Sequence, residues 1–239
     1  MYQFEGRIRY SEVDEDCKLT IANLIDYFQD CSTIQSEDLG VGIDYLREKN
    51  VGWVIVSYHV VVEQMPKLGD RIYSQTWPNK ITGAFGYRNF AIADMDGKRM
   101  AYASSLWILM DLKTGKPIRI PEEISANYEP EPAIEMNDRR RKIRLPEEVT
   151  VDKPVVVSPF FLDSNHHVNN GKYLMVAMGY LPQDLQIRDF YIEYRDQAHL
   201  GDLLYPKYGW VDGNFVIALC AEDDRVYCAM EFIGEHAKH

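Results

Sequence analysis

The sequence contains two similar halves, and this internal repeat constrains the fold more than any other feature. Residues 14–24 (DEDCKLTIANL) align with residues 163–173 (DSNHHVNNGKY), with an aspartate at the head of each. Further along the chain, residues 59–70 and 191–202 align, and both segments end in Leu-Gly-Asp. Because a duplicated sequence folds into two copies of one structural unit, we expect two similar domains.

Each half has the pattern of a loop, a helix and then several strands. Apolar residues recur at helical spacing after Thr20 and after Asn169, and both residues are good helix N-caps. After each Leu-Gly-Asp, alternating segments separated by the turn signals DMDGK and VDGN predict antiparallel strands. The predicted strands cover residues 71–78, 86–93, 98–109, 203–211, 214–221 and 225–232.

This order of elements predicts an α+β fold. A sheet with one apolar face must be covered, and one long helix per sheet is the simplest cover. Two such units in one chain can bury their sheet edges by pairing side by side, which predicts an internal pseudo-dimer. The first half also carries an insertion around residues 40–53.

A stretch rich in proline and acidic residues separates the two halves. Residues 121–132 contain three prolines among several glutamates and have no apolar period. We therefore predict an N-terminal domain over residues 1–125, a linker over residues 126–138 and a C-terminal domain over residues 139–239.

The composition excludes several classes of function. The chain is 46% hydrophobic with a net charge of -11, so it has no general attraction for nucleic acid or anionic membranes. No apolar stretch approaches the roughly 18 residues of a membrane span, and Glu5, Arg7 and Arg9 interrupt the place of a signal peptide. The four cysteines lack CxxC spacing and are expected to be reduced. We expect a cytoplasmic protein.

One polar segment carries groups suited to hydrolysis, which requires a base and donors for an oxyanion that develops at a carbonyl. If this segment is extended, Asp163, Asn165 and His167 project to one side. Asp163 can then polarise water, Asn165 offers an amide, and His167 can titrate near neutral pH. The helix that begins near Asn169 adds backbone N–H groups suited to an oxyanion.

The simplest alternative is a polar turn with no chemical role. In the first half, Asp16 and Lys18 occupy the positions of Asn165 and His167, so the repeated fold does not require Asn and His there. A metal site is disfavoured because adjacent histidines point apart on a strand, and we expect neither a metal nor a cofactor. His199 is assigned to the rim of the site or to the structure.

The string at residues 163–170 (DSNHHVNN), followed by Lys172-Tyr173 and by residues 192–195 (IEYR), resembles the acyl-acyl carrier protein (acyl-ACP) thioesterases in their bacterial form. The resemblance covers nearly the whole chain. It implies two tandem hotdog domains, each a long helix wrapped by an antiparallel sheet. It also implies an enzyme that hydrolyses the thioester of fatty acyl-ACP and releases free fatty acid in fatty acid biosynthesis. An acyl-CoA thioesterase and a non-catalytic acyl-binding module are the alternatives.

The resemblance assigns catalytic roles position by position. Asp163, Asn165 and His167 match the family's catalytic Asp, Asn and His, whereas Gln197 stands where the family usually has Glu. Ala198 replaces the cysteine of many plant members, which excludes a thiol nucleophile there. Glutamine cannot act as a base but can hold a water molecule by its carbonyl oxygen. The base is thus Asp163 or His167, Gln197 positions water, and Glu193 is an outside candidate.

Further residues are assigned to substrate binding. In the family the first domain contributes the acyl-chain pocket, for which Trp53 is a candidate, and Asn169 lies where the helix meets the substrate. The basic run in residues 139–144 (RRRKIR) is either a solvated linker or a docking patch for acidic acyl carrier protein and its phosphopantetheine phosphate. The docking candidates are Arg139, Arg140, Arg141 and Lys142. A homodimer through exposed sheet edges is possible, with neither nucleic acid nor membrane as a partner.

Overall fold

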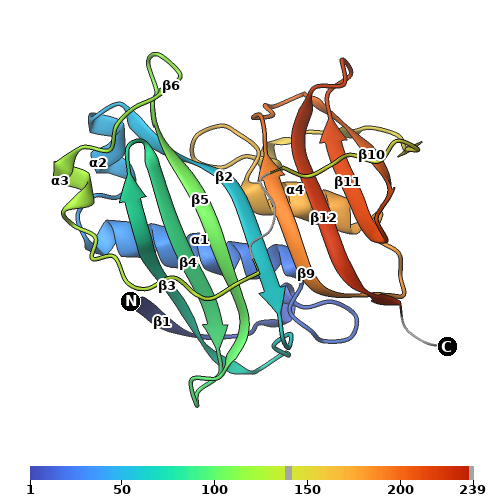
Figure 1. Ribbon diagram of the computed structural model, residues 1–239, viewed down its shortest axis with the longest axis horizontal. Helices are drawn as coiled ribbons and strands as arrows, with labels where there is room; N and C mark the ends of the chain where they lie inside the picture. The colour runs from blue at the N-terminus through green and yellow to red at the C-terminus, as the bar shows by residue number, and fades with distance from the viewer. Residues whose placement is uncertain (138–141, 237–239) are drawn as a thin grey trace. The chain divides into compact units, whose positions relative to one another are not determined.

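The computed structural model describes residues 1–137 and 142–236. The chain divides into two compact units, Met1–Asn137 and Asp138–His239. Each unit combines antiparallel strands with a helix that packs against its own sheet (Figure 1). Within the described ranges, no helix has both the length and the apolar character needed to cross a bilayer.

The first unit is built on five strands in the order β1-β3-β4-β5-β2. The strands are β1 (Tyr2–Arg7), β2 (Val51–Val62), β3 (Arg71–Thr82), β4 (Phe85–Ala93) and β5 (Arg99–Asp111), and the short β6 (Lys116–Pro117) pairs with β5. Its helices are α1 (Ile21–Asp38), α2 (Ile43–Glu48) and α3 (Glu122–Ser125), with a 3-10 turn η1 (Tyr10–Glu12). The three strands predicted here after Leu-Gly-Asp are all present, and each is longer than the sequence pattern indicated.

Helix α1 covers the first sheet because one of its faces is apolar. Thr20 caps the helix by accepting a hydrogen bond from the Asn23 N–H at 3.2 Å. Phe28 is fully buried and packs against Phe90 of β4, with ring centroids 5.2 Å apart. Tyr58 of β2 lies against the same Phe90 ring at 5.8 Å. These aromatic rings form the centre of the first core.

Tyr58 carries a polar atom into this aromatic core. Its hydroxyl is buried and has no hydrogen-bond partner within the described residues, and burial raises the pKa of Tyr58. An unsatisfied buried hydroxyl destabilises the folded state. Tyr58→Phe is therefore expected to increase the free energy of unfolding by about 1 kcal/mol in urea titrations. Tyr27→Phe is the matched control and is expected to destabilise, because the Tyr27 hydroxyl donates to Glu12 at 2.9 Å. Equal destabilisation by both changes would contradict this expectation.

The second unit repeats the arrangement with the strand order β9-β12-β11-β10-β7. The strands are β7 (Thr150–Val151), β9 (Leu185–Tyr194), β10 (Leu203–Val211), β11 (Asn214–Cys220) and β12 (Val226–His236), and the short β8 (Val155–Val156) pairs with β10. The helix is α4 (Asn170–Met178), preceded by a 3-10 turn η2 (Pro159–Phe161). The strands predicted after the second Leu-Gly-Asp are likewise present.

Helix α4 occupies the place in the second unit that α1 occupies in the first. It packs against β11 and β12 and buries Tyr173 and Leu174. Beside it in the core, the Phe190 and Phe232 rings stack at 5.9 Å. Helix α4 has 9 residues and α1 has 18, so the insertion in the first half is accounted for by a longer α1 and the added helix α2.

The end of the first unit extends into the segment predicted as a linker. The Trp77 indole N–H donates to the Pro132 carbonyl at 3.0 Å, and the Ile134 N–H donates to the Asn89 side chain at 3.2 Å. Tyr128 is buried in the first core. Residues 126–137 are therefore fastened to the first sheet by specific hydrogen bonds and apolar packing.

The four thiols differ in exposure. Cys17 is exposed, whereas Cys31, Cys220 and Cys228 are buried. Burial raises the pKa of Cys31 to about 11 and raises that of Cys228 well above its ordinary value. Because the thiolate is the reactive form, the buried thiols are unreactive at neutral pH.

Candidate active site

The loop at residues 163–167 is a tight turn held by its first residue. Oδ1 of Asp163 accepts hydrogen bonds from the backbone N–H groups of Asn165 and His167, at 2.7 and 3.2 Å. The Asp163 N–H donates to the His167 carbonyl at 2.8 Å, and His166 adopts a left-handed conformation with φ of 63°. The expectation of an extended segment with alternating side chains was wrong, because the aspartate side chain folds the backbone into a turn.

The first unit contains the same loop without the same chemistry. Oδ1 of Asp14 accepts from the N–H groups of Asp16 and Lys18 at 3.0 and 2.9 Å, and Cys17 is left-handed with φ of 59°. The hairpin turn at residues 94–98 uses the same pair of side-chain bonds. The leading aspartate is thus a structural element of this turn wherever it occurs. At its third and fifth positions the second-unit copy carries Asn165 and His167, where the first unit has Asp16 and Lys18.

Those two side chains differ in their surroundings. Asn165 is exposed, and His167 is half-buried. Burial lowers the pKa of His167 below its ordinary value, and the charge of His199 lowers it further, while the Asp163 carboxylate acts in the opposite direction. A histidine with a lowered pKa stays neutral at physiological pH, which is the form that accepts a proton. His167 is therefore the candidate for the general base.

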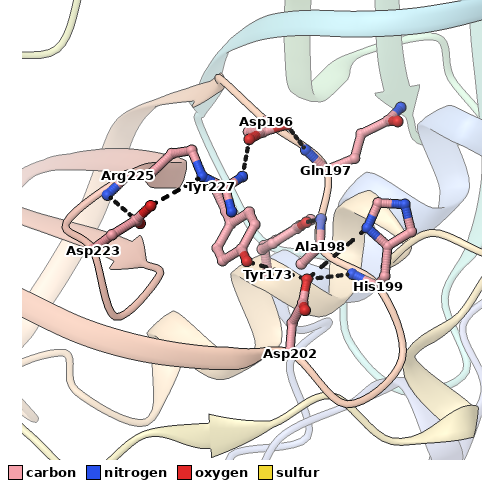
Figure 2. Close-up of polar contacts among 9 residues, drawn as sticks. All are labelled: Tyr173, Asp196, Gln197, Ala198, His199, Asp202, Asp223, Arg225 and Tyr227. Carbon is pink, nitrogen blue, oxygen red and sulfur yellow. Dashed lines mark hydrogen bonds and ion pairs between the residues drawn. The ribbon is translucent and has the colours of Figure 1, made fainter.

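A second segment, residues 196–199, lies against this loop. The Val168 N–H donates to the Ala198 carbonyl at 3.0 Å, and the Ala198 N–H donates to the hydroxyl of Tyr173 at 2.9 Å. Figure 2 shows that the side chains of Gln197 and His199 extend to the same side of this segment. The helix α4 thus fixes the segment that carries the predicted water-positioning residue.

Asn169 serves the helix that it begins. Its Oδ1 accepts from the Gly171 N–H at 2.9 Å, and its carbonyl accepts from the Lys172 N–H at 2.9 Å. The predicted helix start is confirmed, but these two first-turn N–H groups are engaged in the cap. The exposed amide of Asn165 is consequently the better candidate for an oxyanion donor.

Glu193, the outside candidate for the base, is engaged in an ion pair. Its Oε2 accepts from Nη2 of Arg195 at 2.7 Å and from the Ile143 N–H at 3.1 Å. Arg195 also donates to the Ile143 carbonyl at 2.9 Å. Both groups tie β9 to the chain that enters the second unit, which gives them a structural role.

The structure describes some of the predicted substrate-binding residues and not others. Trp53, on β2, packs against the apolar cluster of the first unit that contains Val51 and Leu109. Its ring lies so close to Gly86 that an added Cβ would approach it to 3.4 Å. Lys142 is exposed. The other docking candidates, Arg139, Arg140 and Arg141, lie outside the described residues.

The described part of the chain contains no group of three or more His, Cys, Asp and Glu side chains arranged to hold a metal ion. The candidate site does contain a pair of imidazoles in contact. The rings of His167 and His199 meet edge to face, with centroids 4.9 Å apart and an interplanar angle of 86°. The sequence pattern assigned His199 only to the rim or the structure, because periodicity does not bring residues 167 and 199 together.

Comparisons with known proteins agree with the resemblance in the sequence. The chain is 28% identical over 211 residues to a chloroplastic palmitoyl-acyl carrier protein thioesterase of Cuphea hookeriana, covering 80% of this chain and 50% of that one. It thus spans about half the length of the curated relatives that it matches.

Solved structures extend the likeness over the whole chain. An acyl-ACP thioesterase from Bacteroides thetaiotaomicron is 27% identical, with a TM-score of 0.84, and the match covers 98% of this chain and 97% of that one. The 12:0-ACP thioesterase of Umbellularia californica, at 20% identity, has the same fold with a TM-score of 0.88, over 99% of this chain and 97% of that one. The predicted α+β hotdog fold is confirmed by these likenesses.

Residues 1–128 match the model of the acyl-ACP thioesterase N-terminal domain, which is more than half of the sequence. The second half carries the turn, the half-buried histidine and the facing segment described above. The chain belongs to the acyl-ACP thioesterase family.

Proposed function

We propose that this protein hydrolyses the thioester of fatty acyl-ACP and releases a free fatty acid. The observation that carries the proposal is the half-buried His167, presented by the second-unit turn beside residues 196–199 in a member of this family. The first unit has the same turn with Lys18 in that position, so the histidine is an addition to the fold. We further infer that the protein acts in the cytoplasm, where its thiols stay reduced.

The reaction that these groups support is attack by water. His167 takes one proton from a water molecule as the water oxygen forms a bond to the thioester carbonyl carbon. The carbonyl oxygen becomes an oxyanion, which the amide of Asn165 can stabilise by donating a hydrogen bond. When the C–S bond breaks, the proton on His167 passes to the leaving sulfur. The products are the fatty acid and the free thiol of the carrier.

Acyl carrier protein is the proposed carrier because of the basic run at residues 139–144. The whole chain has a net charge of -11, which repels an acidic partner at long range. Five arginine and lysine residues within six positions provide a local attraction, and arginine binds phosphate groups well. We assign the first unit to acyl-chain binding, with Trp53 as a wall residue.

The test is release of free thiol from two matched series of substrates. Medium- and long-chain acyl groups are presented on acyl carrier protein and on CoA, and the full chain is compared with His167→Ala as a blank. Turnover of the carrier-protein series that is lost in the blank is the expected result. Preferential turnover of the CoA series would identify CoA, rather than acyl carrier protein, as the carrier. Binding of acyl chains without turnover of either series would leave only an acyl-binding module.

Gln197 provides a separate test of how the base is assigned. Its carbonyl oxygen can hold a water molecule, and its backbone N–H donates to Asp196 at 2.8 Å. If His167 is the base, Gln197→Glu should change kcat by less than about threefold, whereas Gln197→Ala should lower kcat by roughly tenfold through loss of a positioned water. Steady-state kinetics on acyl-ACP measure both. An increase of about tenfold in Gln197→Glu would show instead that a carboxylate base at position 197 is missing from this enzyme.

A further inference from the structure

The fold brings two positions together in both units, but only the second unit places imidazoles there. In the first unit the Leu19 N–H donates to the Pro66 carbonyl at 2.8 Å, which sets the loop beside the turn before the first Leu-Gly-Asp. The side-by-side residues are then Lys18 and Lys67, which form an isolated β-bridge. In the second unit the corresponding bond runs from the Val168 N–H to the carbonyl of Ala198, the residue before His199, at 3.0 Å.

The pairing of His167 with His199 is therefore not required by the backbone. Two exposed lysines, Lys18 and Lys67, occupy the same backbone positions in the first unit, and the Lys18 amine lies 3.1 Å from the Asp16 carboxylate. In the second unit the two rings instead meet edge to face at 4.9 Å. An edge-to-face arrangement of aromatic rings is an attractive contact that limits how the His167 ring can turn.

His199 is itself held from two sides. Its backbone N–H donates to Oδ2 of Asp202 at 2.9 Å, and its Nδ1 lies 3.9 Å from the same oxygen. The Tyr227 hydroxyl donates to that carboxylate oxygen at 3.1 Å. On the other side, Tyr173 accepts from the Ala198 N–H. Figure 2 shows these contacts converging on the segment that carries the imidazole. The first unit cannot form the bond that the Ala198 N–H makes to Tyr173, because Pro66, which matches Ala198, has no N–H.

We propose that His199 is a positioning residue that holds the His167 imidazole in place for proton transfer, backed by Asp202. This inference rests on the proposed hydrolysis. His199 lies two residues beyond Gln197 on the same side of the segment, so its ring supports the base although residue 197 is not a carboxylate. The orientation of His167 then depends on packing against a ring rather than on a carboxylate.

Charged groups from two segments, the loop of His167 itself and residues 196–202, surround the His167 ring. Its own loop contributes the Asp163 carboxylate and the exposed His166, and the facing segment contributes His199 with Asp202 behind it. Removing His199 takes away a group that lowers the pKa of His167 and also exposes the ring to water. The pKa of His167 should therefore rise, and the acid limb of the kcat/KM profile should move to higher pH.

The experiment compares the full chain with His199→Ala, His199→Phe and Lys67→Ala on acyl-ACP across pH. His199→Ala is expected to lower kcat by about 10- to 100-fold, with KM nearly unchanged. His199→Phe keeps a ring that buries His167 but carries no charge, so kcat should recover to within a few-fold of wild type while the acid limb lies between those of wild type and His199→Ala. Lys67→Ala, the matched change in the first unit, should leave kcat and the pH profile unchanged.

Two outcomes would overturn the inference. One is a His199→Ala enzyme with the kcat and pH profile of wild type, and the other is an equal loss of kcat in Lys67→Ala. If wild type hydrolyses no acyl thioester, the proposed function fails separately. The inference is then decided by NMR titration of the His167 ring, whose pKa must rise in His199→Ala; an unchanged titration would overturn it.

Discussion

His167→Ala is expected to lower kcat for hydrolysis of fatty acyl-ACP by at least about 10²-fold, because it removes the group that takes the proton from water. Burial and the neighbouring His199 lower the pKa of His167. The neutral base therefore persists to lower pH than for an ordinary histidine, and wild-type activity should fall only below that range. Steady-state kinetics from acidic to neutral pH measure both the loss in the variant and the position of the acid limb.

The control for this loss is Lys18→Ala, the same substitution at the equivalent position of the first-unit loop. Lys18 makes an exposed ion pair with Asp16, and exposed pairs contribute little to stability. Its kcat should match that of wild type. If His167→Ala retained wild-type turnover, His167 would not be the base.

Asp163→Ala and Asp163→Asn are expected to differ sharply in activity. Alanine removes the acceptor of two backbone N–H groups, so the turn loosens, kcat falls by at least about 10²-fold through displacement of His167, and stability falls by about 1–2 kcal/mol. Asparagine keeps an Oδ1 acceptor and should retain most of the activity. Kinetics and urea unfolding on both variants provide the measurement.

Asp14→Ala separates the structural part of this effect from the chemical part. Oδ1 of Asp14 accepts the same two bonds in the first unit, so its removal should lower stability by a similar amount and leave kcat largely intact. An Asp163→Asn enzyme as inactive as Asp163→Ala would indicate instead that the carboxylate takes part in the chemistry, either as the base or through its charge beside His167.

The fold could be predicted from the sequence because the same local signals for helices and turns occur in both halves. The caps at Thr20 and Asn169, the Leu-Gly-Asp turns and the hairpin signals each appear in both halves, and each specifies a local conformation. The course of residues 126–137 could not be predicted in this way. Their attachment depends on single bonds to Trp77 and Asn89 that leave no periodic trace.

The conformation of the candidate site differs from the one that the sequence predicted. The segment at residues 163–167 was singled out because its Asn and His residues are absent from the first half, but the alternation of its side chains suggested an extended segment and the structure has a turn. The pattern Asp-x-Asp at residues 94–96, in a hairpin turn, was the signal that could have identified the turn. The contact between His199 and His167 was not predicted, because it joins two distant segments and spacing along the chain does not reveal it.

Cys17 is a site at which a thiol reagent can label the chain without any substitution. Its backbone is left-handed in the first-unit loop, as that of His166 is in the second-unit loop. Cys17 is exposed, whereas the other three cysteines are buried. Thiol reagents should therefore attach there first. A fluorophore on Cys17 would report what happens around the loop that lacks the Asn and His side chains, while every proposed reacting group remains as it is.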